Sequence, residues 1–227
     1  MNKQFVHKEI DLGYTDLTAK TGKSGRKYFA PNGVSYPSVT TVLSILSEEQ
    51  IQKWRARVGE VEANKISHRA STRGTAVHTI IEKYIDNEEN FEKEFMPNVR
   101  ESFYALKDIL DTRIGDVYAQ EAALYSEHLG LAGRVDCVGI FDGKLSIIDF
   151  KTSKKTKKKS WIENYFIQES AYAIMWEERT GMPITQLVTI ITVDDAEPQV
   201  FVEHRDNWTA KLLETINEYK RRKIFSN

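Results

Sequence analysis

The stretch that decides the fold is Gly133-Arg134-Val135-Asp136-Cys137-Val138-Gly139-Ile140-Phe141-Asp142-Gly143-Lys144-Leu145-Ser146-Ile147-Ile148-Asp149-Phe150-Lys151-Thr152. Asp142-Gly143 separates two apolar runs, residues 131–141 and 144–151, and this dipeptide is typical of a two-residue β-hairpin turn. Such a turn fixes the register of the two strands that it joins. The sequence therefore predicts an antiparallel pair whose facing residues can be counted outward from the turn.

That count brings four charged residues together. Asp136 lies opposite Asp149 as a non-hydrogen-bonded pair, with Cα atoms about 4.5 Å apart. Arg134 lies opposite Lys151. Because side chains alternate between the two faces of a strand, all four are expected on one face, which is otherwise apolar. The opposite face is expected to carry Val135, Cys137, Ile148 and Phe150.

The two aspartates predict a cation site. Opposed carboxylates in a sheet repel each other, and burial raises one pKa unless a cation neutralises both. All-oxygen ligation favours Mg²⁺ or Mn²⁺. Lys151, two residues after Asp149, would stabilise negative charge on a phosphate or on an attacking hydroxide. The alternative is a buried ion-pair cluster in which Arg134 and Lys151 only neutralise Asp136 and Asp149.

Two upstream residues are candidates for the same site. His78 is expected in the first turns of a helix over residues 71–85, where imidazole suits a Mn²⁺ or Mg²⁺ site. There Arg73 and free helix N–H groups would hold a phosphate. Glu121 lies in a strand pattern, residues 117–126, and suits a metal or a water ligand. The alternatives are a core or capping histidine and a solvent-facing edge glutamate.

The segment after the hairpin is rich in groups that bind nucleic acid. Gln168 and Tyr172 are four residues apart on a predicted helix and share a face, where they can bind the lysine, a phosphate or a base. A packed polar helix edge is the alternative. Lys151–Lys159 holds six lysines in nine residues. It is either a solvated loop or a phosphate-backbone track into the site. Aromatic residues that can stack bases follow: Trp161, Tyr165 and Phe166.

The rest of the chain is predicted as helices before and after a compact sheet. Residues 1–37 are irregular or weakly stranded, and Gly22-Lys23-Ser24 is not a phosphate loop because Leu17 stands where that motif needs glycine. One helix is predicted after a capping box of Ser47 and Gln50, with Ile51, Trp54, Val58 and Val61 on one apolar stripe. Further helices are predicted over residues 99–110, 161–179 and 206–222, and further strands over residues 186–193 and 198–203. This pattern indicates an α/β fold in a single domain, 1–227, with an N-terminal helical lobe at 38–112 and a sheet-containing catalytic core at 113–227.

Composition limits the function classes. The formal net charge of -1 argues against a basic nucleic-acid coat, so that DNA contacts must use local patches. One cysteine, Cys137, excludes an internal disulfide, a four-cysteine zinc site and a single-chain iron–sulfur cluster. No run of about 20 apolar residues predicts a membrane span, and no signal-peptide core opens the chain. A cytoplasmic protein of a bacterium or of a phage-infected cell is expected.

The motifs together resemble a known family. Gly-Arg-Val-Asp, Ile-Asp-Phe-Lys-Thr and Gln-x-x-x-Tyr, with an upstream Arg-Gly-x-x-x-His, resemble the RecB-type branch of the PD-(D/E)XK nucleases. Tyr36-Pro37-Ser38-Val39-Thr40-Thr41-Val42-Leu43, with Trp54 downstream, is similar to the mitochondrial genome-maintenance exonuclease group and its phage-encoded relatives. The resemblance covers about residues 28–180 and implies a central mixed sheet flanked by helices.

The resemblance also implies roles for single residues. Asp136 and Asp149 would bind Mg²⁺ or Mn²⁺, with the carbonyl of Phe150 and with His78, and Lys151 would be the catalytic lysine. Glu121 matches the acidic residue of the preceding strand. Gln168 and Tyr172 match the motif that orients the lysine and the nucleic acid, and Arg73 and Ser38 would also contact the nucleic acid. The helical block at 38–112 would form a wall or arch around the strand.

The function predicted is hydrolysis of DNA phosphodiester bonds through in-line attack by a metal-activated water, with single-stranded ends as the expected substrate. DNA replication, repair or recombination is the expected setting, with a protein partner from one of these processes. An endonuclease or junction resolvase of the same fold is one alternative. A DNA-binding module without activity and a purely structural ion-pair cluster are the others.

Overall fold

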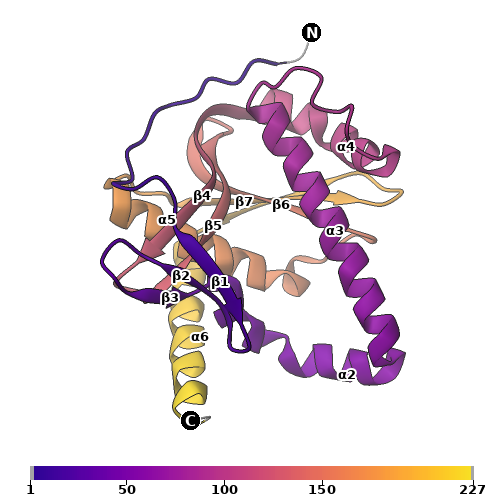
Figure 1. Ribbon diagram of the computed structural model, residues 1–227. Coiled ribbons are helices and arrows are strands. Elements are labelled where there is room, and N and C mark those ends of the chain that lie inside the picture. The colour runs from indigo at the N-terminus through magenta and orange to yellow at the C-terminus, as the bar shows by residue number, and fades with distance from the viewer. Residues whose placement is uncertain (1–2, 226–227) are drawn as a thin grey trace.

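The computed structural model describes residues 3–225 and is built on a five-stranded mixed sheet (Figure 1). The strands lie in the order β4 Ile114–Ser126, β5 Leu131–Phe141, β6 Lys144–Ser153, β7 Gln186–Val193 and β8 Gln199–His204. Only β6 and β7 are parallel, and helix α5 (Glu163–Thr180) makes the crossover that a parallel pair needs. The predicted α/β fold with a central mixed sheet flanked by helices is confirmed.

Helices cover both faces of the sheet. On one face, α3 (Glu60–Ile85) and α4 (Pro97–Arg113) bury an apolar cluster that includes Val77, Ile81, Phe103, Cys137 and Ile148. On the other face, α5 and α6 (Asp206–Phe225) bury a second cluster that includes Val138, Ile147, Met175, Trp176 and Leu212. The sheet is therefore sandwiched, and its strands are apolar on both faces, as expected for central strands.

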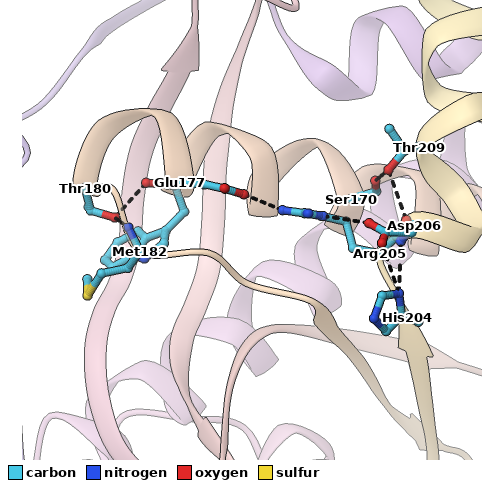
Figure 2. A network of polar contacts seen from close by, with 9 residues as sticks. Ser170, Glu177, Thr180, Met182, His204, Arg205, Asp206 and Thr209 are labelled. Carbon is cyan, nitrogen blue, oxygen red and sulfur yellow. Dashed lines mark hydrogen bonds and ion pairs between the residues drawn. The ribbon is translucent and has the colours of Figure 1, made fainter.

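Helix α5 is held in place by a polar network at its carboxyl-terminal half (Figure 2). Arg205, between β8 and α6, pairs with Glu177 of α5 at 2.5 Å and with Asp206 at 3.2 Å. The hydroxyls of Ser170 and Thr209 lie 3.4 Å apart and join α5 to α6. These contacts fix the helix that carries the predicted Gln-x-x-x-Tyr motif against α6 and the residue that follows β8.

The amino-terminal segment forms a second, smaller antiparallel sheet. It consists of β1 (Thr18–Gly22), β2 (Gly25–Phe29) and β3 (Ser35–Pro37). Gly22 pairs with Gly25, so that Lys23 and Ser24 form a hairpin turn, in agreement with the exclusion of a phosphate loop there. Tyr36 of β3 stacks on Tyr125 of β4, which attaches the small sheet to the large one.

The helices before the sheet differ from the prediction at their ends. A short helix α1 (Val39–Leu43) and a 3-10 turn, η1 (Ser44–Leu46), precede α2 (Glu48–Val58). The capping box is wrong, because Ser47 ends the 3-10 turn and its hydroxyl contacts the carbonyl of Ser44 at 3.5 Å instead of an amide of α2. The predicted apolar stripe is also wrong, since Gly59 (φ +85°) ends α2 and Val61 is 71% exposed in the next helix.

Helix α3 is longer than predicted. It runs for 26 residues from Glu60, not from Ser71, and its first half is mostly exposed. Figure 1 shows α2 and this half of α3 standing away from the sheet. A division into a helical lobe and a catalytic core stays a prediction. None of the helices within residues 3–225 has the length and apolar character to cross a membrane.

Candidate active site

The hairpin turn is confirmed. Asp142 (φ +48°) and Gly143 (φ +80°) both lie in the left-handed region, as a type I′ turn requires. The facing pairs run from Phe141–Lys144 to Cys137–Ile148 in the predicted register.

Beyond Cys137 the β5–β6 backbone pairing ends, and Asp136 uses its side chain instead. Its Oδ2 accepts a hydrogen bond from the backbone N–H of Phe150 at 2.9 Å. On the other side of β5, the pairing with β4 skips Glu121, whose φ of +45° is unusual for a residue with a Cβ. The strands are thus locally distorted on both sides of Asp136.

This distortion corrects two predictions. Val135 packs in the α5-side cluster and Cys137 in the α3-side cluster, so that the two do not share a face as simple alternation predicts. Arg134 does not join Lys151. Its guanidinium donates to the carbonyl of Glu121 and pairs with Asp16 at 2.7 Å. Alternation fails between Val135 and Cys137, where Asp136 is paired in neither the β4 nor the β6 ladder.

A candidate metal group forms beside the distortion. One ligand atom each of His78, Glu121 and Asp136 lies within 4.8 Å of the others, and His78 Nδ1 is 3.5 Å from Asp136 Oδ2. Burial, and then the charge of Asp136, raises the pKa of Glu121 to about 7. One imidazole nitrogen and two carboxylates suit a divalent cation, which would relieve the repulsion between the carboxylates. These residues therefore fit a metal ion.

Asp149 and Lys151 form a second charged group, facing α5. The side chain of Asp149 is 2% exposed, and its Oδ2 pairs with Lys151 Nζ. Burial raises the pKa of Asp149 to about 6, against the opposing effect of Lys151. The pKa of Lys151 lies above its usual range because the attraction of Asp149 and Asp136 outweighs the effect of burial. Ligation of a metal by Asp149 and by the Phe150 carbonyl stays a prediction.

Helix α5 supplies polar contacts to this group. Gln168 Nε2 donates to Asp149 Oδ1 at 3.2 Å, and the ring of Tyr165 lies 5.2 Å from Lys151 Nζ. Tyr172 is buried, and its pKa is well above the usual value because of burial and then the charge of Asp136. Gln168 contacts Asp149 of β6 and Tyr172 packs on Gly133 of β5, so both lie on the face of α5 that meets the sheet, as expected from their spacing of four.

Tyr172 packs directly on the backbone of Gly133, which predicts a steric effect. A Cβ at position 133 would lie 2.7 Å from Tyr172 Cε1. We expect Gly133→Ala to lower the free energy of unfolding by about 1–3 kcal/mol, measured by urea denaturation. Gly74→Ala in α3 is the control, since its nearest neighbour would be 4.0 Å away and alanine favours a helix. Equal stability of Gly133→Ala and the wild type would contradict this packing.

Glu169 is a buried carboxyl beside the site that is not among the residues predicted from the sequence. This carboxyl is fully buried on α5, accepts a hydrogen bond from Thr189 of β7, and has a pKa well above its usual value because of burial and then the charge of Asp149. Its position was open to prediction. Residues 166 and 173 lie three before and four after it, and both are apolar, which places Glu169 on the buried stripe of the helix.

Two residues that were predicted to contact nucleic acid, Arg73 and Ser38, bind other residues of the protein in the structure. Arg73 pairs with Asp194, with Nη1 2.9 Å from Oδ2, and donates to Ser102 at 3.0 Å. Because α3 starts at Glu60, Arg73 lies well inside the helix, and the predicted free helix N–H groups beside it are wrong. Ser38 is buried and caps α1 by accepting from the N–H of Thr41 at 3.0 Å. A nucleic-acid role for either residue stays a prediction.

The raised carboxyl pKa values predict a pH dependence of the metal-free protein. Glu121 and Asp149 bind protons more tightly when folded, so their contribution to stability is complete below about pH 4 and is lost as the pH rises toward 7. Allowing for screening at the partly exposed Glu121, we expect a loss of about 2 kcal/mol, measured by urea denaturation in chelator. Glu121→Gln should flatten the profile. A free energy of unfolding that rises over this window would contradict the assignment.

Fold and site together have the arrangement expected of a nuclease: a mixed sheet with carboxylates and a lysine on an antiparallel pair of central strands. Residues 52–226 match the family model of the PD-(D/E)XK nuclease superfamily, and the chain belongs to that superfamily.

Curated relatives agree with this assignment. The chain is 32% identical to mitochondrial genome maintenance exonuclease 1 of Homo sapiens over 210 residues, covering 84% of this chain and 60% of that protein. It is 27% identical to the Xenopus tropicalis protein of the same name, covering 92% of this chain and 63% of that one. The chain thus spans less than two thirds of the length of these relatives. A solved structure from Eubacterium rectale aligns with a TM-score of 0.44 at 16% identity, over 67% of this chain and 65% of that one. This TM-score and this identity are too low to bear on function.

Proposed function

We propose that this protein is a Mg²⁺- or Mn²⁺-dependent DNA exonuclease that acts on single-stranded ends. The observation that carries the proposal is the position of Asp136, which lies between the group His78–Glu121 and the pair Asp149–Lys151. Membership of a nuclease superfamily and the relation to an exonuclease support it. Replication, repair or recombination in a bacterial or phage-infected cell, with a protein partner, belongs to the same proposal.

The residues divide the chemistry between them. His78, Glu121 and Asp136 would hold the metal ion, with Asp149 as a further ligand. A divalent cation at such a site lowers the pKa of water and neutralises phosphate charge. The Lys151 ammonium stabilises the negative charge that develops on the phosphate. Gln168 holds the Asp149 carboxylate at 3.2 Å and so keeps the partner of Lys151 in place.

Linear and circular single-stranded DNA test whether cleavage starts from an end. The protein is incubated with each, with Mg²⁺, with Mn²⁺ or with chelator. The proposal predicts metal-dependent loss of the linear strand and survival of the circle. Cutting of the circle would make the protein an endonuclease of the same fold. Binding without cleavage of single-stranded or duplex DNA would make it a DNA-binding module.

A further inference from the structure

A groove of about 510 Å³ lies between α3 and the loop that follows β6. Five of its lining residues are cations: Arg69, Arg73, Lys154, Lys155 and Lys157. No acidic residue of the described chain, residues 3–225, lines it. We call this the basic groove, and its charge suits a polyanion.

Among residues 3–225, four of these cations form no ion pair within 4.0 Å. Within the part of the chain that the structure describes, no acidic side chain lies within 4.0 Å of the charged groups of Arg69, Lys154, Lys155 or Lys157. Nearby Lys159, by contrast, pairs with Glu203 at 2.5 Å, and Arg73 pairs with Asp194. The charge of Lys154 also acts on Asp194, but the cations around the groove outnumber this one carboxylate. They therefore repel each other, and an anion bound there would remove that repulsion.

The lysines stand on a loop whose backbone is fixed. Gln199 of β8 accepts from the N–H of Lys157 at 2.6 Å and donates to its carbonyl at 3.0 Å. Ser153 donates to the carbonyl of Lys155 at 2.6 Å. Because this loop is held at both ends, its lysines lose less conformational freedom when a ligand binds. The loop is therefore better suited to binding than a mobile, solvated lysine-rich segment would be.

The basic groove and the candidate active site lie on the same two elements, β6 and α3. Thr152, which lines it, follows Lys151 on β6. Along α3, Arg69 precedes His78 by nine residues, a rise of about 13 Å. At the spacing of about 3.4 Å per nucleotide of a stacked strand, this distance corresponds to about four nucleotides.

We infer that the basic groove binds backbone phosphates of the nucleic-acid strand a few nucleotides from the bond that is cleaved. The inference rests on the proposed function and extends it, since it assigns strand binding to a site outside the metal group. The ligand is the phosphodiester backbone and not the bases, so binding there is independent of sequence. Arg73 shapes the groove wall and stays paired with Asp194.

The test measures binding of a fluorescent single-stranded oligonucleotide over a salt series, with every protein carrying Lys151→Met so that the strand is not cut. Lys154→Gln with Lys155→Gln should weaken binding about tenfold at low salt and reduce the slope of log K against log salt by about 1.4, about 0.7 for each lost phosphate contact. The matched control is Lys93→Gln with Lys144→Gln, two exposed lysines outside the basic groove, which should bind like the parent.

The possible failures are distinguishable. If the groove variant binds with the affinity and the salt slope of its parent, the inference is wrong while the proposed function stands. Competition by inorganic phosphate as strong as by oligonucleotide, at equal phosphate concentration, would also overturn it, because the groove would then take a free anion. If the protein without Lys151→Met neither binds nor cuts DNA, the proposed function fails first.

Discussion

Replacing Lys151 with methionine should strongly slow cleavage of single-stranded DNA while leaving a folded protein. The substitution keeps the length of the side chain and removes the ammonium beside Asp149. The loss of one positioned group that stabilises charge in the transition state should lower the rate by about 10²- to 10³-fold. The measurement is single-turnover cleavage at saturating protein, so that weaker binding is not mistaken for slower chemistry.

The same substitution has a second consequence that makes the test sharper. Lys151 lowers the pKa of Asp149, which burial raises to about 6, so its removal should raise that pKa further. Asp149 then takes up a proton near neutral pH, which limits the cost of an unpaired buried charge. Lys144→Met, at the exposed start of the same strand, is the control. Cleavage by a folded Lys151→Met variant at the rate of the unsubstituted protein would remove this lysine from the active site.

Asp136→Asn should have opposite effects on activity and on stability. Without metal, the neutral amide relieves repulsion with Glu121, whose pKa Asp136 raises, while its oxygen can still accept from the N–H of Phe150. We expect the Tm in chelator to rise by about 2–4 °C, corresponding to about 1 kcal/mol. Cleavage should fall by about 10³-fold or more, because the residue that joins the two charged groups is lost.

The readout that separates these effects is thermal unfolding with and without Mn²⁺. Unsubstituted protein should gain about 2.7 kcal/mol at a Mn²⁺ concentration one hundred times the Kd, and Asp136→Asn should lose this gain. Asp108→Asn, on the exposed face of α4, is the control and should behave like the unsubstituted protein. An undiminished Mn²⁺ shift in Asp136→Asn would place the metal elsewhere.

Much of the sheet could be predicted from sequence, because its signals are local. The Asp142-Gly143 turn fixes the register of β5 and β6, and the apolar run at 186–193 coincides with β7. The helix predicted over 99–110 lies within α4, whose buried residues Val99, Phe103, Leu106 and Leu110 recur at helical spacing. These patterns specify both the element and the face that it buries.

The features that could not be predicted depend on contacts between distant segments. The sequence around Glu121 gives no sign of its positive φ. This conformation occurs where β4 passes Asp136 and where Arg134, from the neighbouring strand, donates to the carbonyl of Glu121. The distortion brings Glu121 toward His78 and removes Arg134 from the site. The sequence does not reveal that α3 starts at Glu60, because the first half of this helix is mostly exposed and has too few apolar residues to show a helical period.

Cleavage of end-labelled linear single-stranded DNA, followed in Mg²⁺, in Mn²⁺ and in chelator, tests most directly whether this carboxylate and lysine site is a metal-dependent nuclease. The account predicts cleavage with either ion, none in chelator, and recovery when the ion is returned in excess. Cleavage that continues at the same rate in chelator, or a folded protein that cuts no DNA with any divalent ion, would contradict it.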